Sequence, residues 1–307
     1  MAREHKLRIA GCYIVRNEAA VLAKSLDSLA GAVDELVVVD TGSEDDTAQI
    51  ARSRGARVVS HEWREDFSEA RNFALGELGA KVYDFPWQDD FAAARNFALS
   101  KATGDWIAFL DADEYFTPET RGRLRAEIEA ADAAGTDLLL IQWRNIDADT
   151  GAHLVDVYTP RIFRLKPELR YQGRIHEQLC ENGGLVRRTA IVPEERLLLI
   201  HTGYSTHLSK AKAARNLRLL LADMAESEHP ETLYMAIAEA YDGLGDEAMA
   251  LKYAYLDIEN GRQASTYASR SYRILLRRLA ARPAAFEERR EAARRATEDF
   301  PELPEFH

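Results

Sequence analysis

The sequence predicts an α/β fold, a mostly parallel sheet with helices on both faces, followed by a domain built from helices alone. Two observations support this prediction. In the first half of the chain, short apolar runs of strand length alternate with segments of helical period, as in successive βαβ units. From about residue 205 the helical period continues to the end of the chain. We therefore expect two domains, at residues 1–205 and 206–307.

Composition agrees with two soluble domains. The 307 residues allow about two domains of roughly 150 residues each. Apolar residues make up 46% and charged residues 30%, which excludes a mainly disordered chain, a collagen and a membrane bundle. The 40 Lys and Arg against 51 Asp and Glu give a net charge of −11. General nucleic-acid binding, which depends on neutralising phosphates, is therefore not expected.

Cysteine use and hydropathy indicate the compartment. Two cysteines, Cys12 and Cys180, cannot form a disulfide scaffold, so we expect a reducing environment. The apolar run Ile9–Val15 stops at Arg16 without a cleavage site and is typical of a buried strand. No segment reaches the ~18 apolar residues of a transmembrane helix. We expect a cytoplasmic protein.

The first domain begins with a regular alternation of strands and helices. Ser43 is a good N-cap and Gly55 a good C-terminal stop, so a helix is expected between them. The remaining elements are a strand at Ile9–Val15, a helix at Glu18–Ala30, and strands at Glu35–Asp40 and Arg57–Ser60.

An internal repeat interrupts this alternation. Residues 55–75 read GARVVSHEWREDFSEARNFAL, and residues 79–99 read GAKVYDFPWQDDFAAARNFAL. Each copy is expected to form a strand, a turn and a helix, so one β-α unit, 55–78, is duplicated as 79–102. Two copies are too few for a solenoid. We expect an added strand at a sheet edge or a protruding flap.

The second half of the chain begins with more strands and ends in helices. The stretch Ala236–Tyr255 has Ala238, Tyr241, Gly245 and Ala250 spaced as in a tetratricopeptide helix pair. Before it, we expect a strand at Trp106–Leu110, a helix at Arg121–Ala134, a strand at Asp137–Trp143, and short strands with turns over residues 144–200.

The strongest local motif is Asp111-Ala112-Asp113-Glu114, directly after the apolar strand. Alternate residues of an extended chain share a face, so the Asp111 and Asp113 carboxylates are expected to point the same way. Such a pair holds a hard divalent cation well and repels itself without one. A solvated acidic turn is the alternative. The position at the end of a buried strand favours metal binding.

Two further motifs lie where a strand gives way to a helix: Arg16-Asn17-Glu18 and Asp40-Thr41-Gly42-Ser43. In parallel sheets, ligands bind beyond the carboxyl ends of the strands. Gly42 permits a sharp turn, and the polar groups before it suit a base and a ribose. Ordinary turn and capping chemistry explains the same residues, so neither motif is specific alone.

Three more positions are candidates for chemistry. Arg95 precedes the Asp111 strand on a helix, and its forked donors suit a diphosphate. Glu177, which follows the basic segment Arg161–Arg164, can act as a general base if an acceptor hydroxyl or thiol lies in reach. The His201 imidazole can complete a metal shell begun by two carboxylates. The structural alternatives are a surface helix residue, a solvated glutamate and a packed core histidine.

Six blocks follow one another over residues 7–205. They read YIVRNEA (13–19), ELVVVDTGSEDDT (35–47), DDFAAARNFALSKATGDWIAFLDADEYF (89–116), RIFR (161–164), RYQGRIHEQL (170–179) and HTGY (201–204). In this order they resemble the family 2 glycosyltransferases of the GT-A fold. The closest resemblance is to the bacterial branch with tetratricopeptide-like helices behind the catalytic domain.

The resemblance implies a nucleotide-diphosphate sugar as donor, with a UDP-sugar as first choice, and a divalent cation, Mn or Mg. It implies direct displacement with inversion at the anomeric carbon, Glu177 being the catalytic base while the metal and Arg95 stabilise the departing diphosphate. It assigns the metal to Asp111, Asp113 and His201. It assigns the nucleotide sugar to Val15, Arg16, Asn17, Glu18, Asp40, Thr41, Gly42, Ser43, Arg95, Asn96, Asp111 and Ala112.

The chain departs from the family pattern by carrying two copies of the DDFxxARNFAL block. The second copy keeps the expected distance to Asp111, so function is assigned to Arg95-Asn96, and Arg71-Asn72 is taken as structural. Because the extra unit can block the donor cleft, an alternative remains open. In that alternative the domain is catalytically idle, and a helical-repeat scaffold serves protein interaction.

The sequence leaves the acceptor open among glycan, lipid-linked sugar and peptide. Residues 264–295 hold nine Arg against three Glu. Solvated helix faces explain them. The sharper hypothesis is a peripheral contact, at the inner membrane face, with anionic lipid headgroups or a lipid-diphosphate acceptor, in which Arg277 and Arg278 take part. Exposed helical repeats also make a homodimer an expected partner arrangement.

Overall fold

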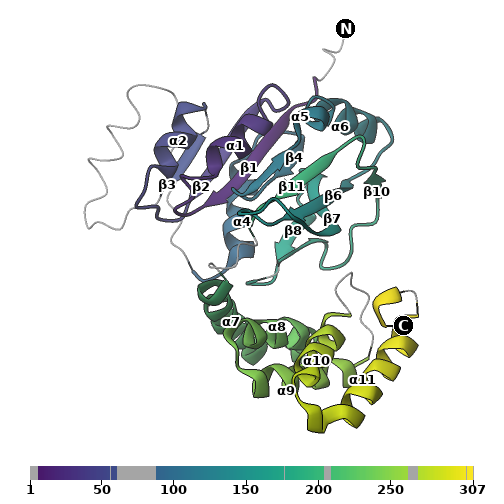
Figure 1. Ribbon diagram of the computed structural model, residues 1–307. Coiled ribbons are helices and arrows are strands. Elements are labelled where there is room, and N and C mark those ends of the chain that lie inside the picture. The colour runs from purple at the N-terminus through teal and green to yellow at the C-terminus, as the bar shows by residue number, and fades with distance from the viewer. Residues whose placement is uncertain are drawn as a thin grey trace. The chain divides into compact units, whose positions relative to one another are not determined.

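The computed structural model describes residues 6–55, 57–60, 88–175, 177–203, 209–261, 269–301 and 303–306. The chain divides into two compact units, Met1–Ser205 and Thr206–His307. The first unit is a mixed sheet with helices, and the second is helical (Figure 1). The predicted fold class is confirmed.

The sheet of the first unit runs in the order β3-β2-β1-β4-β7-β6-β11-β5, and β10 pairs with β6. β3, β2, β1 and β4 are mutually parallel, whereas β7 lies antiparallel between β4 and β6. The separate strands β8 and β9 form an antiparallel pair. The strands are β1 (Ile9–Val15), β2 (Glu35–Asp40), β3 (Arg57–Ser60), β4 (Trp106–Phe109), β5 (Glu114–Phe116), β6 (Leu138–Ile146), β7 (His153–Arg164), β8 (Leu169–Gln172), β9 (Gln178–Glu181), β10 (Thr189–Val192) and β11 (Leu198–His201).

Strand β1 shows why the sheet is covered on both faces. Its alternate residues enter two separate apolar clusters, Ile9 and Tyr13 on one face and Ala10 and Cys12 on the other. A strand that is apolar on both sides is typical of a parallel sheet between two layers. Helices α1 and α6 supply the first cluster, and α4 with β8 and β9 supplies the second. The helices of this unit are α1 (Leu22–Ser28), α2 (Thr47–Ser53), α4 (Phe91–Lys101), α5 (Pro118–Arg121) and α6 (Leu124–Ala133).

Several expected boundaries are wrong. Ser43 does not cap a helix, because its hydroxyl accepts a hydrogen bond from Asn17 N and α2 begins only after Asp46. The helix expected from Glu18 begins at Leu22. The helix expected over Arg121–Ala134 is α6, which begins three residues later, at Leu124, after a turn at Gly122 and Arg123 that separates it from α5.

Strand β7 also differs from expectation. It is 12 residues long instead of short, since it pairs with β6 from His153 to Phe163 and with β4 at its C-terminal end, Ile162–Arg164. Within the duplicated segment, β3 and α4 are described and agree with the predicted strand of the first copy and helix of the second. The remainder, residues 61–87 with Arg71 and Asn72, lies outside the described residues, so the choice between strand and flap stays a prediction.

The helical unit contains the predicted helix pair. Gly245 ends α8 in the left-handed conformation (φ 84°), which only glycine adopts readily, and Asp246 caps α9 through Met249 N. Ala238 and Ala250 are fully buried where the two helices pack. The elements are α7 (Ser209–Glu226), η2 (Pro230–Leu233), α8 (Tyr234–Leu244), α9 (Glu247–Glu259), α10 (Arg270–Ala280), η3 (Pro283–Ala285), α11 (Phe286–Asp299) and η4 (Pro304–Phe306).

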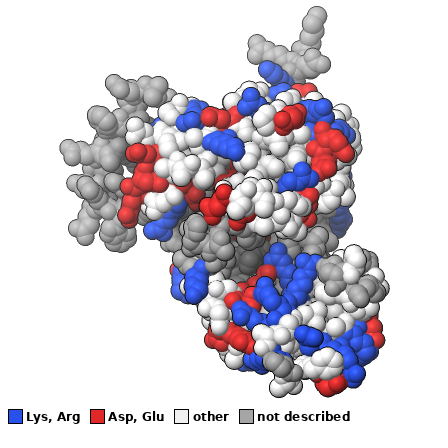
Figure 2. All heavy atoms as spheres, in the orientation of Figure 1, with Lys and Arg blue, Asp and Glu red and all other residues white. Residues whose placement is uncertain are grey.

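Many arginines of this unit are held in ion pairs within it. Arg277 and Arg278, on α10, both bind Asp242 on α8, and Arg270 binds Glu239. Figure 2 accordingly shows basic and acidic side chains interleaved over the helical unit. This arrangement agrees with solvated, paired helix faces. No helix among the described residues has the length and apolar character needed to cross a membrane.

Candidate active site

The candidate site lies at the edge of the sheet where parallel strands end. β1 leads to Arg16, β2 ends at Asp40 and β4 leads to Asp111, and these three strands are parallel neighbours. β11, which runs parallel to β6, ends at His201. Residues from distant parts of the sequence therefore meet at one edge, as expected for a ligand site of a parallel sheet.

Two loops at this edge are tied together by their own polar groups. Asp40 Oδ1 accepts hydrogen bonds from Gly42 N (3.1 Å) and Ser43 N (2.8 Å). Asn17, held in the left-handed region (φ 55°), accepts a bond from Glu44 N at 2.8 Å. The Thr41 hydroxyl bonds to the Val15 carbonyl. The loops that the sequence assigned to base and ribose are thus preorganised.

The predicted nucleotide-binding residues differ in exposure. Asp40, Thr41 and Ala112 are buried, and Ala112 packs in the apolar core. Arg16 and Asn17 are exposed, and Glu18 is half-buried. Among these positions, solvent reaches the side chains of the β1 loop most easily.

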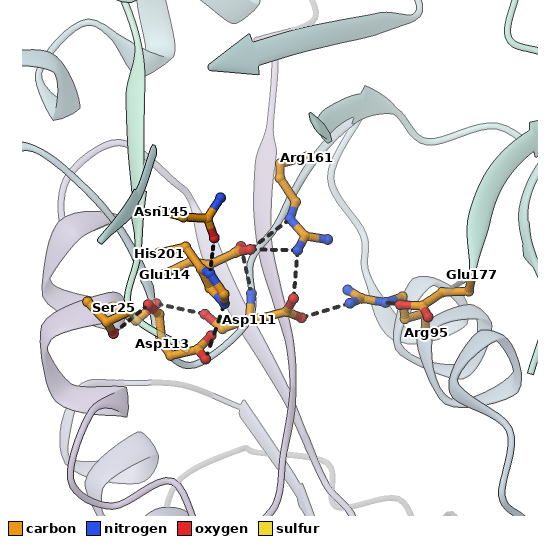
Figure 3. Close-up of polar contacts among 10 residues, drawn as sticks. Ser25, Arg95, Asp111, Asp113, Glu114, Asn145, Arg161, Glu177 and His201 are labelled. Carbon is orange, nitrogen blue, oxygen red and sulfur yellow. Dashed lines mark hydrogen bonds and ion pairs between the residues drawn. The ribbon is translucent and has the colours of Figure 1, made fainter. Parts of the chain in front are cut away.

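Asp113 and His201 lie together on the side of the site next to β11 (Figure 3). His201 Nε2 is 3.4 Å from Asp113 Oδ2. His201 Nδ1 lies 2.6 Å from Asn145 Oδ1, its neighbour across the β6–β11 pairing. If the ring carries its proton on Nδ1, it donates to this Asn145 oxygen. The lone pair is then on Nε2, which faces the Asp113 carboxylate. Two electron-rich atoms facing each other suit a bound cation.

Gly203 packs against this pair and leaves no room for a side chain of its own. A Cβ atom on Gly203 would lie 2.5 Å from His201 Nε2 and even closer to Asp113 Oδ2. Real Cβ atoms essentially never make contacts this short, so a side chain would displace the pair. The His201 ring also packs against the Trp143 ring, with 4.3 Å between the two centroids.

These residues fit a cation as a partial shell. Among the described residues, no three His, Cys, Asp or Glu side chains lie close enough together to hold a metal alone. Mg²⁺ in nucleotide sites is typically held by one or two carboxylates together with substrate phosphates. Asp113 and His201 therefore fit an ion that a diphosphate would complete.

Asp111 faces a different set of partners. Its Oδ1 binds Arg95 Nη2 at 2.7 Å, and its Oδ2 binds Arg161 Nη2 at 2.6 Å. Burial opposes ionisation, but Arg161 and Arg95 outweigh it and hold the pKa of Asp111 well below its usual range. Asp111 is thus an ionised counter-ion between two guanidinium groups (Figure 3). The structure places it with the arginines, not beside Asp113 and His201.

Glu114 belongs to the same cluster as Asp111 and Arg161. It is fully buried, accepts a bond from Asp111 N at 3.0 Å and binds Arg161 through Oε1 at 2.5 Å. Burial raises the pKa of Glu114 to about 7, with Arg161 opposing the shift and Asp111 adding to it. Glu114 therefore fixes both the backbone of Asp111 and the side chain of Arg161.

Arg95 connects Asp111 to Glu177. Its Nε donates to Glu177 Oε1, and its guanidinium carbon is 4.6 Å from the Phe109 ring centroid. Asn96, the next residue, uses its side chain otherwise. Its amide donates to Tyr171 O at 2.8 Å and accepts from Tyr171 N at 2.9 Å. Asn96 therefore fixes strand β8, which leads toward Glu177.

The structure brings together Arg95, Asp111, Asp113, Glu177 and His201 in one site (Figure 3). It adds residues for which the sequence analysis predicted no role. Arg161 and Glu114 lie inside quoted blocks, so their position was a usable signal. Nothing in the sequence marked Trp143 or Asn145, because their role depends on the pairing of β6 with β11.

Comparison with known proteins identifies the family of this chain. Residues 12–78 and 76–153 match Glycosyl transferase family 2. The chain belongs to this family. The two matched segments meet inside the repeat of residues 55–99, as expected if a duplication interrupts the family pattern.

Two relatives show how this glycosyltransferase chain compares in length. A TPR repeat-containing protein of Synechococcus elongatus is 32% identical over 232 residues, 73% of this chain and 49% of the relative. The SPbeta prophage-derived glycosyltransferase SunS of Bacillus subtilis is 27% identical over 252 residues, 80% and 52% of the two chains. The chain therefore spans about half the length of these curated relatives.

Solved structures give weaker likenesses to this family 2 chain. S. aureus TarS 1–349 is 14% identical, with 96% of this chain and 89% of that chain covered and a TM-score of 0.45. Glucosyl-3-phosphoglycerate synthase from Mycobacterium tuberculosis, solved with Mn²⁺, UDP-glucose and phosphoglyceric acid, is 27% identical over 45% of this chain and 44% of that chain, with a TM-score of 0.32.

Proposed function

We propose that this family 2 glycosyltransferase chain transfers a sugar from a UDP-sugar to the hydroxyl or thiol of an acceptor. The observation that supports the proposal best is the meeting of two groups at one sheet edge. Asp113 and His201 present ligands suited to a cation, and Arg95 and Arg161 present guanidinium groups suited to a diphosphate. A nucleotide-diphosphate donor needs both.

Asp113 and His201 would hold the divalent cation, Mn or Mg. When bound, the ion neutralises charge that develops on the leaving diphosphate. Arg95 is positioned for the same task, because its side chain is buried and fixed by Asp111 and Glu177. We assign Asp111 the role of holding Arg95 and Arg161 in place.

The preorganised loops after β1 and β2 would bind the nucleoside. Arg16 and Asn17 in the loop after β1 are exposed and accessible to a ligand. Asp40 and Thr41 are buried, and their side-chain hydrogen bonds fix the loop after β2. Glu177 would take the proton of the acceptor. Its ion pair with Arg95 holds the carboxylate in place at the site.

A donor screen tests the proposal. The purified chain is mixed with UDP-, GDP- and dTDP-sugars and with Mn²⁺ or Mg²⁺, and nucleotide release and thermal shift are measured. We expect metal-dependent release from a UDP-sugar, reduced at least a hundredfold by Asp113→Asn. Glu119→Gln, the same change at an exposed position on α5, should leave release unchanged.

Two outcomes would contradict the proposal. A thermal shift with a UDP-sugar but no release, identical in the wild type and Asp113→Asn, would favour the idle donor-binding domain. No shift and no release with any nucleotide sugar would refute donor binding as well.

A further inference from the structure

Buried polar atoms without a hydrogen-bond partner gather at one place in the first unit. Among its described residues, such side-chain atoms are Arg95 Nη1, Trp143 Nε1 and Tyr171 Oη. Folded proteins pair nearly all buried polar groups, so each exception needs a cause. All three exceptions border the Asp111 cluster. Arg95 binds Asp111, Arg161 lies 5.9 Å from the Trp143 ring centroid, and Arg95 lies 5.3 Å from that of Tyr171.

The Tyr171 ring is fixed independently of its hydroxyl. Its backbone is bound on both sides by the Asn96 amide. Its ring packs edge-on against Phe109 (5.6 Å) and Phe163 (5.9 Å), and the residue is 4% exposed. The fold therefore holds the hydroxyl in place without a polar contact of its own.

The charges that act on the Tyr171 hydroxyl are those of the site. Burial raises the pKa of Tyr171 well above its usual range, while Arg95 and Arg161 lower it and Glu177 raises it. The group is thus a neutral hydroxyl at physiological pH. It can donate one hydrogen bond and accept another.

We propose that the Tyr171 hydroxyl binds an oxygen of the nucleotide-sugar donor, which it shares with Arg95 Nη1. The oxygen belongs either to the diphosphate or to a hydroxyl of the transferred sugar. This inference rests on the proposed function of the site. It accounts for two buried donors that the free protein leaves unpaired, since a bound donor supplies the missing acceptor.

Asp111 has the most exposed side chain of the cluster, at 35%, against 13% for Glu177 and 6% for Arg95. Arg95 Nη1 and the Tyr171 hydroxyl are closed to solvent, so side chains must shift when the donor enters. A diphosphate oxygen is the same kind of partner for Arg95 as the carboxylates that hold it now. Because Glu177 and Asp111 bind Nε and Nη2, the donor oxygen adds a further partner at Nη1.

Tyr171→Phe tests the proposal because it removes one oxygen and leaves the ring. Binding of UDP, UDP-glucose and UDP-N-acetylglucosamine is measured by calorimetry with Mn²⁺ present, for wild type and variant. We expect affinity for the UDP-sugar to fall about tenfold, as for loss of one hydrogen bond. An equal fall for UDP assigns the hydroxyl to the diphosphate. A fall confined to the UDP-sugars assigns it to the sugar.

Stability separates this role from a structural one. Removing a buried hydroxyl that has no partner should not lower the melting temperature. Tyr272→Phe is the matched control in the helical unit, since its hydroxyl donates to Asp299. It should lower the melting temperature and leave the affinity for UDP-sugars unchanged.

Unchanged affinity of Tyr171→Phe for all three nucleotides would overturn the inference and leave the proposed function intact. A wild-type protein that binds none of them would overturn both.

Discussion

Two regions of this molecule are rich in arginine and acidic residues, and they use them differently. At the sheet edge, Arg95 is 6% exposed and binds Asp111 and Glu177 at once. On the helical unit, Arg277 is 65% exposed and binds Asp242, and Arg294 is 56% exposed and binds Glu291. Both regions pair arginines with carboxylates, but the arginine side chains differ in their exposure to solvent.

The difference shows where charge carries function. Exposed ion pairs contribute little to stability, typically 0–1 kcal/mol, and water can replace either partner. A buried guanidinium must find partners in the protein or in a ligand, since unpaired burial is costly. Arg95 has two carboxylates and still keeps Nη1 for a further partner. The site is thus identified by burial and unmet hydrogen bonds, not by charge alone.

An arginine-to-lysine substitution in each region should have the largest difference in effect on activity. Arg95→Lys removes the forked donors between Asp111 and Glu177, and we expect donor hydrolysis to fall about a hundredfold. Arg277→Lys should leave hydrolysis unchanged and stability within about 0.5 kcal/mol. Initial rates and thermal melts of both variants check this. Equal rates for the two variants would refute the assignment of Arg95.

The space beside Asp113 and His201 provides the next test. Gly203→Ala should weaken Mn²⁺ binding at least tenfold, because the new Cβ overlaps both side chains. Gly122→Ala is the control, since a Cβ there meets nothing within 4 Å and its backbone is helical. Metal titration followed by thermal shift compares them. Equal metal affinity in both variants would show that the space is not needed for a cation.

A smaller effect is expected on the helical unit. The Arg278 guanidinium donates to the carboxylate of Asp242 (2.6 Å) and to the backbone carbonyl oxygen of Asp242 (2.9 Å), which joins α10 to α8. A double-mutant cycle of Arg278→Ala and Asp242→Asn should give a coupling of about 0.5–1 kcal/mol. Donor hydrolysis should not change. Binding to anionic vesicles that is lost in Arg278→Ala, with the unit stable, would instead support the membrane hypothesis.

The smallest effects concern pH, and they should have opposite signs in the two units. Burial opposes ionisation of Asp137, but Lys166 and Arg188 outweigh it and lower its pKa. Its contribution to stability is therefore present above the unfolded pKa near 4 and lost as the pH falls through the lower folded pKa. Asp137→Asn should destabilise the protein at pH 7 and less so at acid pH.

For Asp257, burial raises the pKa, while the bond from Ser271 opposes the shift. Its contribution is therefore present below the unfolded pKa and lost as the pH rises through the folded pKa. Asp257→Asn should gain stability relative to wild type as the pH rises from about 4 to 7. Thermal melts across this range check both variants. Parallel pH profiles for the two would contradict the assigned directions.

The sequence by itself determined the architecture and the position of the candidate site residues. Apolar runs of strand length with intervening helical periods gave β1 and β2 their bounds, because burial on both faces leaves a continuous apolar signal. The motifs at strand ends located Asp111, Asp113 and His201, since parallel strands bring their carboxyl ends to one edge.

The tertiary structure alone decided how these residues divide their work. Asp111 and Asp113 are two residues apart, yet one faces Arg95 and Arg161 and the other faces His201. That choice depends on pairings such as β6 with β11 and on the docking of β8 against α4, which join residues far apart in the chain. The local sequence determines which chemical group stands at each position. The distances, burial and missing partners that give it a role arise only when the chain folds.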